Sequence, residues 1–208
     1  HKEVLDRIGQ LAGNTLVERV RAQPQDVAAA AQLLRAYGDA FASKAQGVRT
    51  SVVALIADGF GDRARAANGD ATTLGASLRA LRASLGADAA AIELRTATAL
   101  ARSIADASKA NPTDVVSITP RVRAFTEHLP AHVPLLVERL VPGITAGLTT
   151  LVETSAENVS ALAEPLGQLR ALLPAAGEEV AVRLGPVAVE GLAVLVESQP
   201  LSEFMQTT

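Results

Sequence analysis

Two of the three histidines have a spacing that could hold a metal ion. His128 and His132 are four residues apart, so a continuous helix would place both imidazoles on one face, as in many zinc sites. Pro130 lies between them, and proline interrupts a helix or begins a new one. The nearest carboxylates are Glu127 and Glu138, and the sequence contains no cysteine. We therefore interpret the pair as solvated or capping histidines and predict no metal site.

The third histidine, His1, stands where the printed sequence begins. An amino-terminal histidine can bind copper when processing creates that terminus, and a remnant of a tag is the other interpretation. No signal-peptide pattern opens the sequence. The sequence therefore predicts no particular localisation.

The segment Asp58-Gly-Phe-Gly-Asp62 combines two carboxylates with two glycines in a helical context. Such a segment could form a bent site rich in oxygen ligands. A calcium loop needs oxygen ligands at alternate positions, but Phe60 occupies the middle one and no glutamate follows at the required distance. We interpret the glycines as a kink or a close-packing point and the aspartates as surface residues.

Six arginines could form a basic face for a phosphate, for an acidic partner, or for the acidic second half of this chain or of another copy. Aspartates and glutamates are mixed among them, which favours a solvated face of both charges. The arginines are Arg63, Arg65, Arg79, Arg82, Arg95 and Arg102.

The triplet from Asn158 to Ser160 is formally a glycosylation acceptor, a pattern that arises often by chance.

Motifs for nucleophilic or cofactor chemistry are missing from the sequence. There is no G-x-S-x-G elbow, no phosphate-binding P-loop and no G-x-G-x-x-G following a strand. Glu-x-x-His pairs of the kind that bind two iron ions in helical bundles are missing as well. Any two carboxylates that the fold brings together would escape this search. We predict that the chain is not an enzyme, and we assign no catalytic, cofactor or metal residues.

The composition excludes several classes of protein. The chain has 208 residues, of which 49% are hydrophobic and 2% aromatic, with no cysteine and no tryptophan. An apolar share this high with a net charge of -3 argues against a disordered chain. Without cysteine there is no disulfide framework, and with so few aromatic residues there is no stacking platform for nucleic acid. We expect a soluble helical protein that binds no nucleic acid.

The two halves of the chain differ in composition. Residues 1–110 are rich in alanine and carry a net charge of +3, whereas residues 111–208 carry a net charge of -6 and nine of the ten prolines. Alanine favours helix and lets helix axes approach closely. We predict one helical domain over residues 1–208, with a sub-boundary possible at 111–120.

Apolar residues in the first half recur at the three- and four-residue steps of amphipathic helices. Val4, Ile8 and Leu11 share one helix face, and Gly13-Asn14 is a possible break after it. A stripe from Val27 to Ala45 follows the expected cap Asp26 and ends at Gly47. Further stops are expected at Asn68-Gly69, Gly86 and Asn111-Pro112, with Asp70 as another cap.

Prolines divide the second half. Thr119-Pro120 is typical of a helix start, and Pro142-Gly143 of a helix end. Residues 180–196 alternate with a period of two in part, which fits a short hairpin, but the neighbouring signals are helical and we favour helix. The sequence alone leaves this alternative open.

The second half also contains a weak repeat. Pro120, Pro142, Pro165 and Pro186 are spaced by 22, 23 and 21 residues, and residues 142–154 align with residues 186–198. Exchangeable apolipoproteins have a proline-punctuated repeat of similar length, but lipid-surface helices need basic residues along their borders. From residue 140 onward this chain has only Arg170 and Arg183. We interpret the repeat as helix–turn–helix units in a bundle and assign the chain to no family.

The sequence therefore predicts an all-α fold, a multi-helix bundle of about six to nine helices. The longest uncharged apolar stretch, residues 140–152, is shorter than the ~20 residues of a membrane-spanning helix, so no transmembrane segment is expected. We expect a non-catalytic module that acts by protein–protein interaction or self-association. The alternative is a lipid or another apolar small molecule bound in a cavity of the Val/Leu-rich region from Val133 to Val196.

Overall fold

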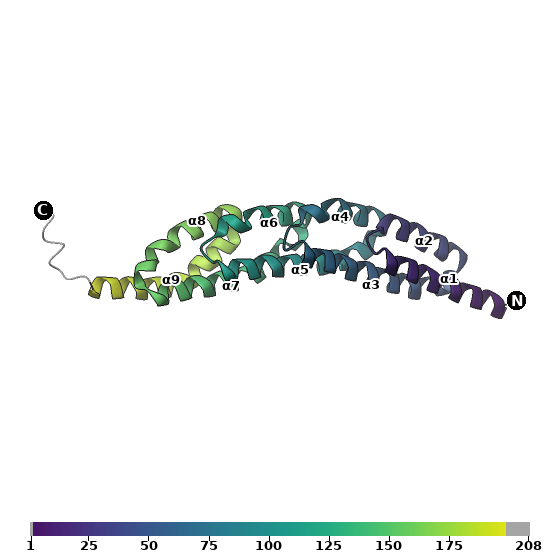
Figure 1. The fold of residues 1–208 in the computed structure, drawn as a ribbon, viewed down its shortest axis with the longest axis horizontal. Helices are drawn as coiled ribbons and strands as arrows, with labels where there is room; N and C mark the ends of the chain where they lie inside the picture. Colours follow the sequence, from purple (N-terminus) through teal and green to yellow (C-terminus); the bar gives the residue numbers. More distant parts are fainter. Residues whose placement is uncertain (1, 199–208) are drawn as a thin grey trace. The chain divides into compact units, whose positions relative to one another are not determined.

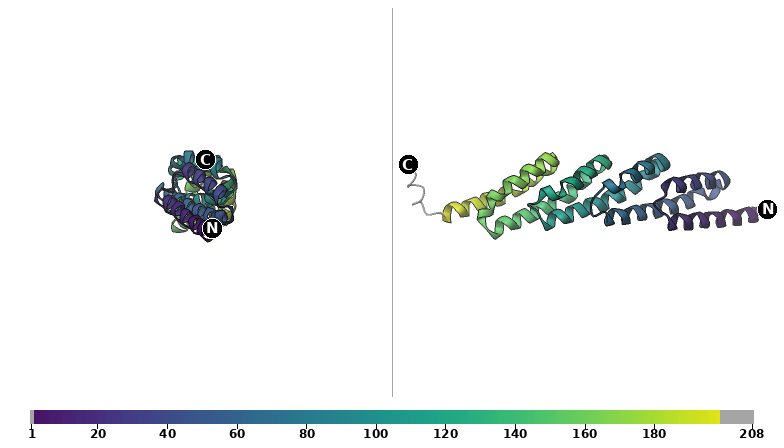
Figure 2. Two further views of the ribbon diagram at one scale, coloured as in Figure 1. Left: turned by 90° about the vertical axis from the view of Figure 1, so that its right-hand side faces the viewer. Right: turned by 45° about the horizontal axis from the view of Figure 1, so that its top comes forward.

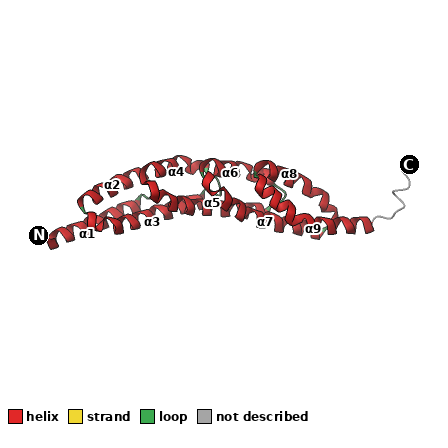
Figure 3. Ribbon diagram, turned by 180° about the vertical axis from the view of Figure 1, so that it is seen from behind, coloured by secondary structure: helices red, strands yellow, loops and turns green. Residues whose placement is uncertain are grey.

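The computed structural model describes residues 2–198, and these residues fold into helices joined by short connections (Figures 1 and 3). This confirms the predicted all-α multi-helix fold. The α-helices of the described residues are nine in number, at the upper end of the expected range. They are α1 (Lys2–Ala22), α2 (Val27–Ala40), α3 (Ala42–Ala66), α4 (Thr72–Leu85), α5 (Ala89–Ala110), α6 (Val115–His128), α7 (Val133–Thr154), α8 (Ala163–Leu172) and α9 (Pro174–Ser198). Three 3₁₀ segments join them: η1 (Gly86–Asp88), η2 (Pro130–His132) and η3 (Ala156–Leu162).

The helices group into two compact units. Of the described residues, unit 1 comprises residues 2–100 and Glu127–His132, and unit 2 comprises Ala101–Thr126 and residues 133–198. Each unit has its own buried apolar residues, as its length allows. The expectation of a single domain with a sub-boundary at 111–120 stays a prediction.

In unit 1, helices α1, α2 and α3 lie side by side, and α2 also packs against α4 (Figure 2). The buried face of α1 contains two glycines, and a Cβ atom on Gly13 would lie 2.8 Å from Val48 Cγ2 and 3.0 Å from the Tyr37 hydroxyl. The Tyr37 hydroxyl donates a buried hydrogen bond of 2.9 Å to the Gly9 carbonyl. The expected break at Gly13-Asn14 is therefore wrong, because Gly13 lets neighbouring helices approach a continuous α1.

The stripe predicted from Val27 to Ala45 is divided into two helices, and Gly47 lies inside the second. The break is at Phe41, whose backbone leaves the helical region with φ -137° and ψ 54°. Phe41 packs beside Tyr37, with ring centroids 5.3 Å apart, and its ring approaches Gly9 in α1. The prediction of one helix ending at Gly47 is wrong because packing of Phe41 against α1 outweighs the periodic pattern.

The two predicted helix-start caps are used. The carboxylate of Asp26 accepts a hydrogen bond of 3.1 Å from the Ala29 amide at the start of α2. The carboxylate of Asp70 accepts a bond of 2.9 Å from the Thr72 amide, although Ala71 holds the cap position of α4. Both carboxylates satisfy amide groups that a helix start leaves without a partner inside the helix.

The other three predicted stops in this half, at Asn68-Gly69, Gly86 and Asn111-Pro112, are confirmed. Asn68 and Gly69 both take positive φ values, 49° and 85°, after the end of α3. Gly86 takes φ 55° at the end of α4. Glycine and asparagine tolerate these left-handed conformations, which are costly for other residues. Helix α5 ends at Ala110, immediately before Asn111-Pro112.

In unit 2, α7 packs along α9, and η3 and α8 also pack against α9. Residues 180–196 belong to α9, so helix is confirmed and the hairpin alternative is wrong. The proline predictions are mostly wrong, since Pro120, Pro142 and Pro186 all lie inside helices. Helix α6 begins at Val115 instead of Pro120.

Burial of apolar neighbours explains why the helices continue through these prolines. Each proline removes one intrahelical hydrogen bond and costs about 3 kcal/mol in a helix interior. Val141 and Ile144 flank Pro142 and are buried, and Leu184 before Pro186 is buried as well. Burying one such side chain contributes about 1.5–3 kcal/mol, so a few of them offset the cost of the proline.

Because α7 continues through Pro142, its apolar stretch is longer than the sequence analysis expected. Within the described residues, Pro130–Thr154 is one helical stretch that is long and apolar enough to cross a membrane, with a mean hydropathy of 1.4. The sequence estimate was shorter because it counted only the uncharged residues 140–152, which lie between Arg139 and Glu153. A core helix passes the same test, and Leu136, Leu140 and Leu148 of this stretch are buried. The expectation of no transmembrane segment stays a prediction.

Candidate interaction surface

The carboxyl-terminal part of α9 exposes an apolar surface, which we call the α9 face. Its apolar side chains lie on one side of the helix when successive residues are placed 100° apart. Three of them, Val182, Val189 and Val196, repeat at intervals of seven residues. Every member is exposed. The opposite side of the helix, with Val180, Leu184 and Gly191, is buried. The α9 face consists of Val182, Pro186, Val189, Leu192, Ala193 and Val196.

A second exposed apolar surface belongs to α1 in unit 1. Val4, Leu5, Ile8 and Leu11 are all about half exposed or more, and we call them the α1 face. The sequence pattern placed three of these residues on one helix face, but the buried face of α1 is formed by other residues. The buried residues of α1 are Gly9, Gly13, Leu16 and Val20.

Beside the α1 face, an apolar groove of about 410 Å³ runs between α1 and α2. Tyr37 and Phe41 line it from the α2 side, and Arg19 is the charged residue in its lining. We call this hollow the α1–α2 groove. Its remaining lining is Ala12, Thr15, Leu16, Leu33, Ala36 and Ala40.

The two histidines with the spacing of metal ligands, His128 and His132, lie on either side of Pro130. Helix α6 ends at His128, and His132 lies at the end of the 3₁₀ segment that follows. The His128 ring lies against α4, where a Cβ atom on Gly75 would be 2.6 Å from His128 Cε1. Within the described residues no group of three or more His, Cys, Asp or Glu side chains is placed to bind a metal ion.

His132 instead joins a polar cluster in unit 1. Its Nε2 atom lies 4.0 Å from Oε2 of Glu93, a carboxylate that is only 12% exposed. Arg82 Nε donates to Glu93 Oε1 at 2.5 Å, and its terminal nitrogen donates to the His128 carbonyl at 2.7 Å. The Arg82 side chain therefore ties the segment around Pro130 to α4 and α5. Holding these segments together is a structural role for the ion pair of Arg82 and Glu93.

We expect Arg82→Ala to destabilise unit 1 by about 1–2 kcal/mol, because it leaves the Glu93 carboxylate and the His128 carbonyl without this donor. Arg79→Ala on the same helix is the matched control, expected to change stability by less than about 0.5 kcal/mol. Urea unfolding followed by circular dichroism measures both. Equal effects of the two substitutions would show that the cluster adds nothing to stability.

The Asp58–Asp62 segment lies within α3 and forms no loop. Asp58 pairs with Arg95, and Asp62 pairs with Arg65 on the same helix. A Cβ atom on Gly59 would lie 2.7 Å from Pro24 Cβ, so this glycine serves close packing. The structure thus separates the two carboxylates into different ion pairs, as the close-packing interpretation predicts.

The six arginines are divided among several contacts. Arg65, Arg82 and Arg95 are ion-paired with neighbouring carboxylates. Arg63 donates to the Ser77 hydroxyl at 3.3 Å and lies 5.6 Å from the centre of the Phe60 ring. This arrangement fits the expected mixed surface better than a single basic face.

The glycosylation triplet has a structural role at its asparagine. The Asn158 amide nitrogen donates to the Leu151 carbonyl at 2.8 Å. Asn158 is half-buried within η3. Its side chain thus helps to satisfy a carbonyl group near the end of α7.

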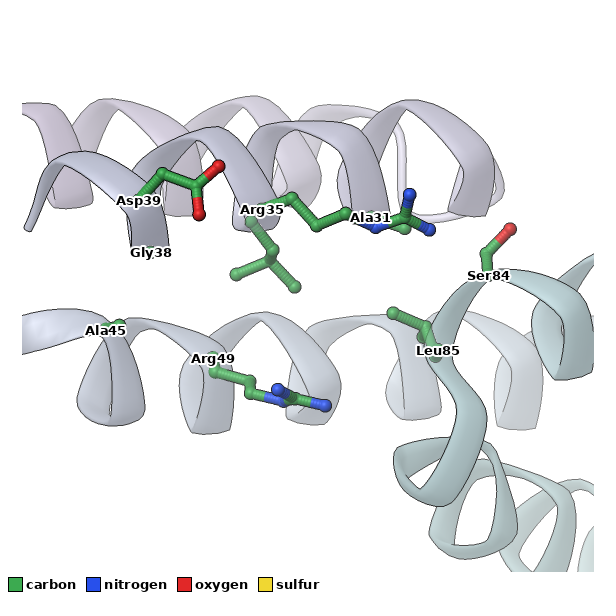
Figure 4. A pocket seen from close by; sticks show the side chains of 9 residues that line it. Ala31, Arg35, Gly38, Asp39, Ala45, Arg49, Ser84 and Leu85 are labelled. Atoms are coloured by element: carbon green, nitrogen blue, oxygen red, sulfur yellow. The ribbon is translucent and has the colours of Figure 1, made fainter. Parts of the chain in front are cut away.

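A second hollow in unit 1, of about 280 Å³, has a mixed lining of charged and apolar side chains (Figure 4). Arg35 and Asp39 project from α2, and Arg49 projects from α3 on the opposite wall. Arg49 is already paired with Asp88 at 2.5 Å. Charges of both signs around the hollow give it no clear preference for an anion or a cation.

The sequence pattern allowed the helical face of α1 and the repeat in α9 to be recognised, but it gave no sign that these faces are exposed. The signal that identifies them is the burial of side chains in the folded units. Comparison of the chain with protein-family models, curated proteins and solved structures finds no match.

Proposed function

We propose that the chain is a non-catalytic helical module that acts by protein–protein contact, in the first place by self-association. The observation that carries this proposal is the α9 face, which is apolar over fifteen residues of helix, from Val182 to Val196. Contiguous exposed apolar surface of this kind marks an interaction site more often than isolated apolar residues do. The period of seven is the spacing at which two helices bury a shared seam.

The internal repeat supports the same proposal. Residues 142–154 and 186–198 align, so Leu148 corresponds to Leu192 and Val152 corresponds to Val196. In α7, Leu148 and Val152 are 0% and 4% exposed. In α9, their equivalents Leu192 and Val196 are 50% and 75% exposed. The same local sequence is therefore covered by a neighbouring helix in one place and left uncovered by the described residues in the other.

The apolar-ligand alternative concerns the Val/Leu-rich region of unit 2. A hollow of about 280 Å³ lies there between α7 and α9. Its lining includes Val152, Val187 and Val194, but also the carboxylates Glu153 and Glu190. Two carboxylates are poor neighbours for an acyl chain, so we prefer protein contact. Native mass spectrometry that finds a lipid bound to the purified chain would favour the alternative.

Sedimentation velocity over a range of micromolar concentrations tests the proposal. We expect the wild-type chain to self-associate and Val189→Glu to abolish this, because a charge in the seam must be desolvated on association. Val116→Glu is the matched control, since Val116 and Val189 are 63% and 66% exposed and the charge change is the same. A wild-type chain that stays monomeric throughout would contradict self-association.

A further inference from the structure

We infer that the α9 face of one copy docks against the α1 face and the α1–α2 groove of a second copy. This inference rests on the proposed self-association and names the two surfaces that meet. The contact would be heterologous, since different surfaces of the same chain pair with each other.

The first argument is how unit 2 covers the equivalent part of α7. After Pro142, helix α7 is covered by α9, and a Cβ atom on Gly191 would lie 2.9 Å from Val152 Cγ1. Among the aligned residues, Leu192 and Val196 of the α9 face match the covered Leu148 and Val152 of α7, whereas Val189 and Ala193 replace Thr145 and Thr149. Structural repeats bury their faces against neighbouring units, so the occupant suited to the α9 face is another apolar helix surface.

The second argument is the match in shape and length. The α9 face spans the fifteen residues from Val182 to Val196, whose ends are about 21 Å apart along the helix. The α1 face and the groove beside it extend over the sixteen residues from Val4 to Arg19, whose ends are about 22 Å apart along the helix. A helix that presents apolar residues at every second turn fits an apolar groove between two helices.

The third argument is charge. Glu190 and Glu197 lie along one edge of the α9 face, and neither is among the ion-paired residues of the described chain. Arg19 lines the groove, and its guanidinium is likewise outside the ion pairs of residues 2–198. Pairing of the α9 face with the groove therefore brings opposite charges together at the rim.

Charge also distinguishes this arrangement from a symmetric one. Two α9 faces related by a two-fold axis in an antiparallel pair would place the carboxylates of Glu190 and Glu197 on the same side of the seam. The Glu190 carboxylates of the two copies would then lie close together and their like charges oppose such a pair, and Arg183 on the same edge offsets only part of this repulsion. In the groove, Arg19 offers these carboxylates a cation instead.

The test mixes two variants, each with one surface disabled. Val189→Glu disables the α9 face, and Leu11→Glu disables the α1 face. Both positions are exposed, so we expect both variants to fold, which circular dichroism checks. We expect each variant alone to be monomeric in sedimentation velocity and the equimolar mixture to form a 1:1 complex, because one intact interface remains. The wild-type chain should form larger species as its concentration rises, since a heterologous contact need not close.

Three outcomes would overturn the inference in different ways. A mixture that stays monomeric, while the wild-type chain associates, rejects this pair of surfaces and leaves self-association standing. Leu11→Glu that associates alone as well as the wild type does shows that α1 is not part of the interface. A wild-type chain that is monomeric at every concentration rejects both the docking and the self-association on which it rests.

Discussion

Leu148→Ala should lower the free energy of unfolding of unit 2 by about 2–5 kcal/mol, whereas Leu192→Ala should lower it by less than about 0.5 kcal/mol. The two leucines occupy the same position in the two copies of the repeat, and both lie one residue after a glycine. Leu148 is fully buried, so its removal loses transfer free energy and leaves a cavity. Leu192 is half exposed and loses little contact within its own unit.

Urea unfolding at a dilute chain concentration measures this pair, with helix content followed by circular dichroism. The dilute condition matters because Leu192 belongs to the α9 face, and association would add to its apparent contribution. At high concentration the cost of Leu192→Ala should therefore increase. Equal costs for the two substitutions under dilute conditions would mean that α9 is covered within the single chain.

Gly177→Ala should destabilise unit 2 by about 1–3 kcal/mol, the usual cost of overpacking. A Cβ atom at this position would lie 2.5 Å from Arg170 Cγ and 2.7 Å from the Arg170 backbone nitrogen and Cα. A flexible side chain could turn away, but a backbone atom can move only if α8 shifts from α9. The close approach of the two helices therefore depends on glycine here.

Gly167→Ala, in the same unit, is expected to change stability in the opposite direction. Gly167 lies inside α8, and a Cβ atom there would meet nothing within 4 Å. Alanine in an open helical position should therefore stabilise by up to about 1 kcal/mol. Thermal and urea unfolding compare the two alanine variants. A stabilising Gly177→Ala would show that α8 and α9 are less closely packed than the structure places them.

Much of the fold could be predicted because its signals are local. Asp26, Gly86 and Asn68-Gly69 act through their own backbone or the first amides of the next helix, so their effect does not depend on distant parts of the chain. Periodic apolar residues likewise identified helices throughout the first half. Such features belong to a few consecutive residues and can be recognised without the fold.

The wrong predictions concern helix ends, at positions where contacts with distant residues determine whether the helix continues. Gly13 and Gly47 look like helix ends in the sequence, but both lie inside helices. Gly13 is there because Tyr37 and Val48 approach its backbone. Pro142 looks like an end as well, but buried neighbours hold α7 together on both sides of it. A sequence shows that a residue permits a break, whereas tertiary packing decides whether the break forms.

The candidate surface illustrates the same limit. The alignment of residues 142–154 with residues 186–198 was visible in the sequence, but Leu148 and Val152 are buried whereas their equivalents Leu192 and Val196 are exposed. Exposure depends on which helix comes to lie alongside, and this is a property of the folded unit. The groove between α1 and α2 also combines residues separated by more than twenty positions, so no local pattern indicates it.

The position of Tyr37 gives the unmodified chain an optical signal. The sequence has one tyrosine and no tryptophan, so this phenol is the source of almost all its near-ultraviolet absorbance and intrinsic fluorescence. Tyr37 lines the α1–α2 groove and donates its hydroxyl hydrogen to the Gly9 carbonyl. A helix that enters the groove changes the surroundings of that ring and therefore its emission. Occupancy of the groove can thus be followed by spectroscopy without attaching a dye.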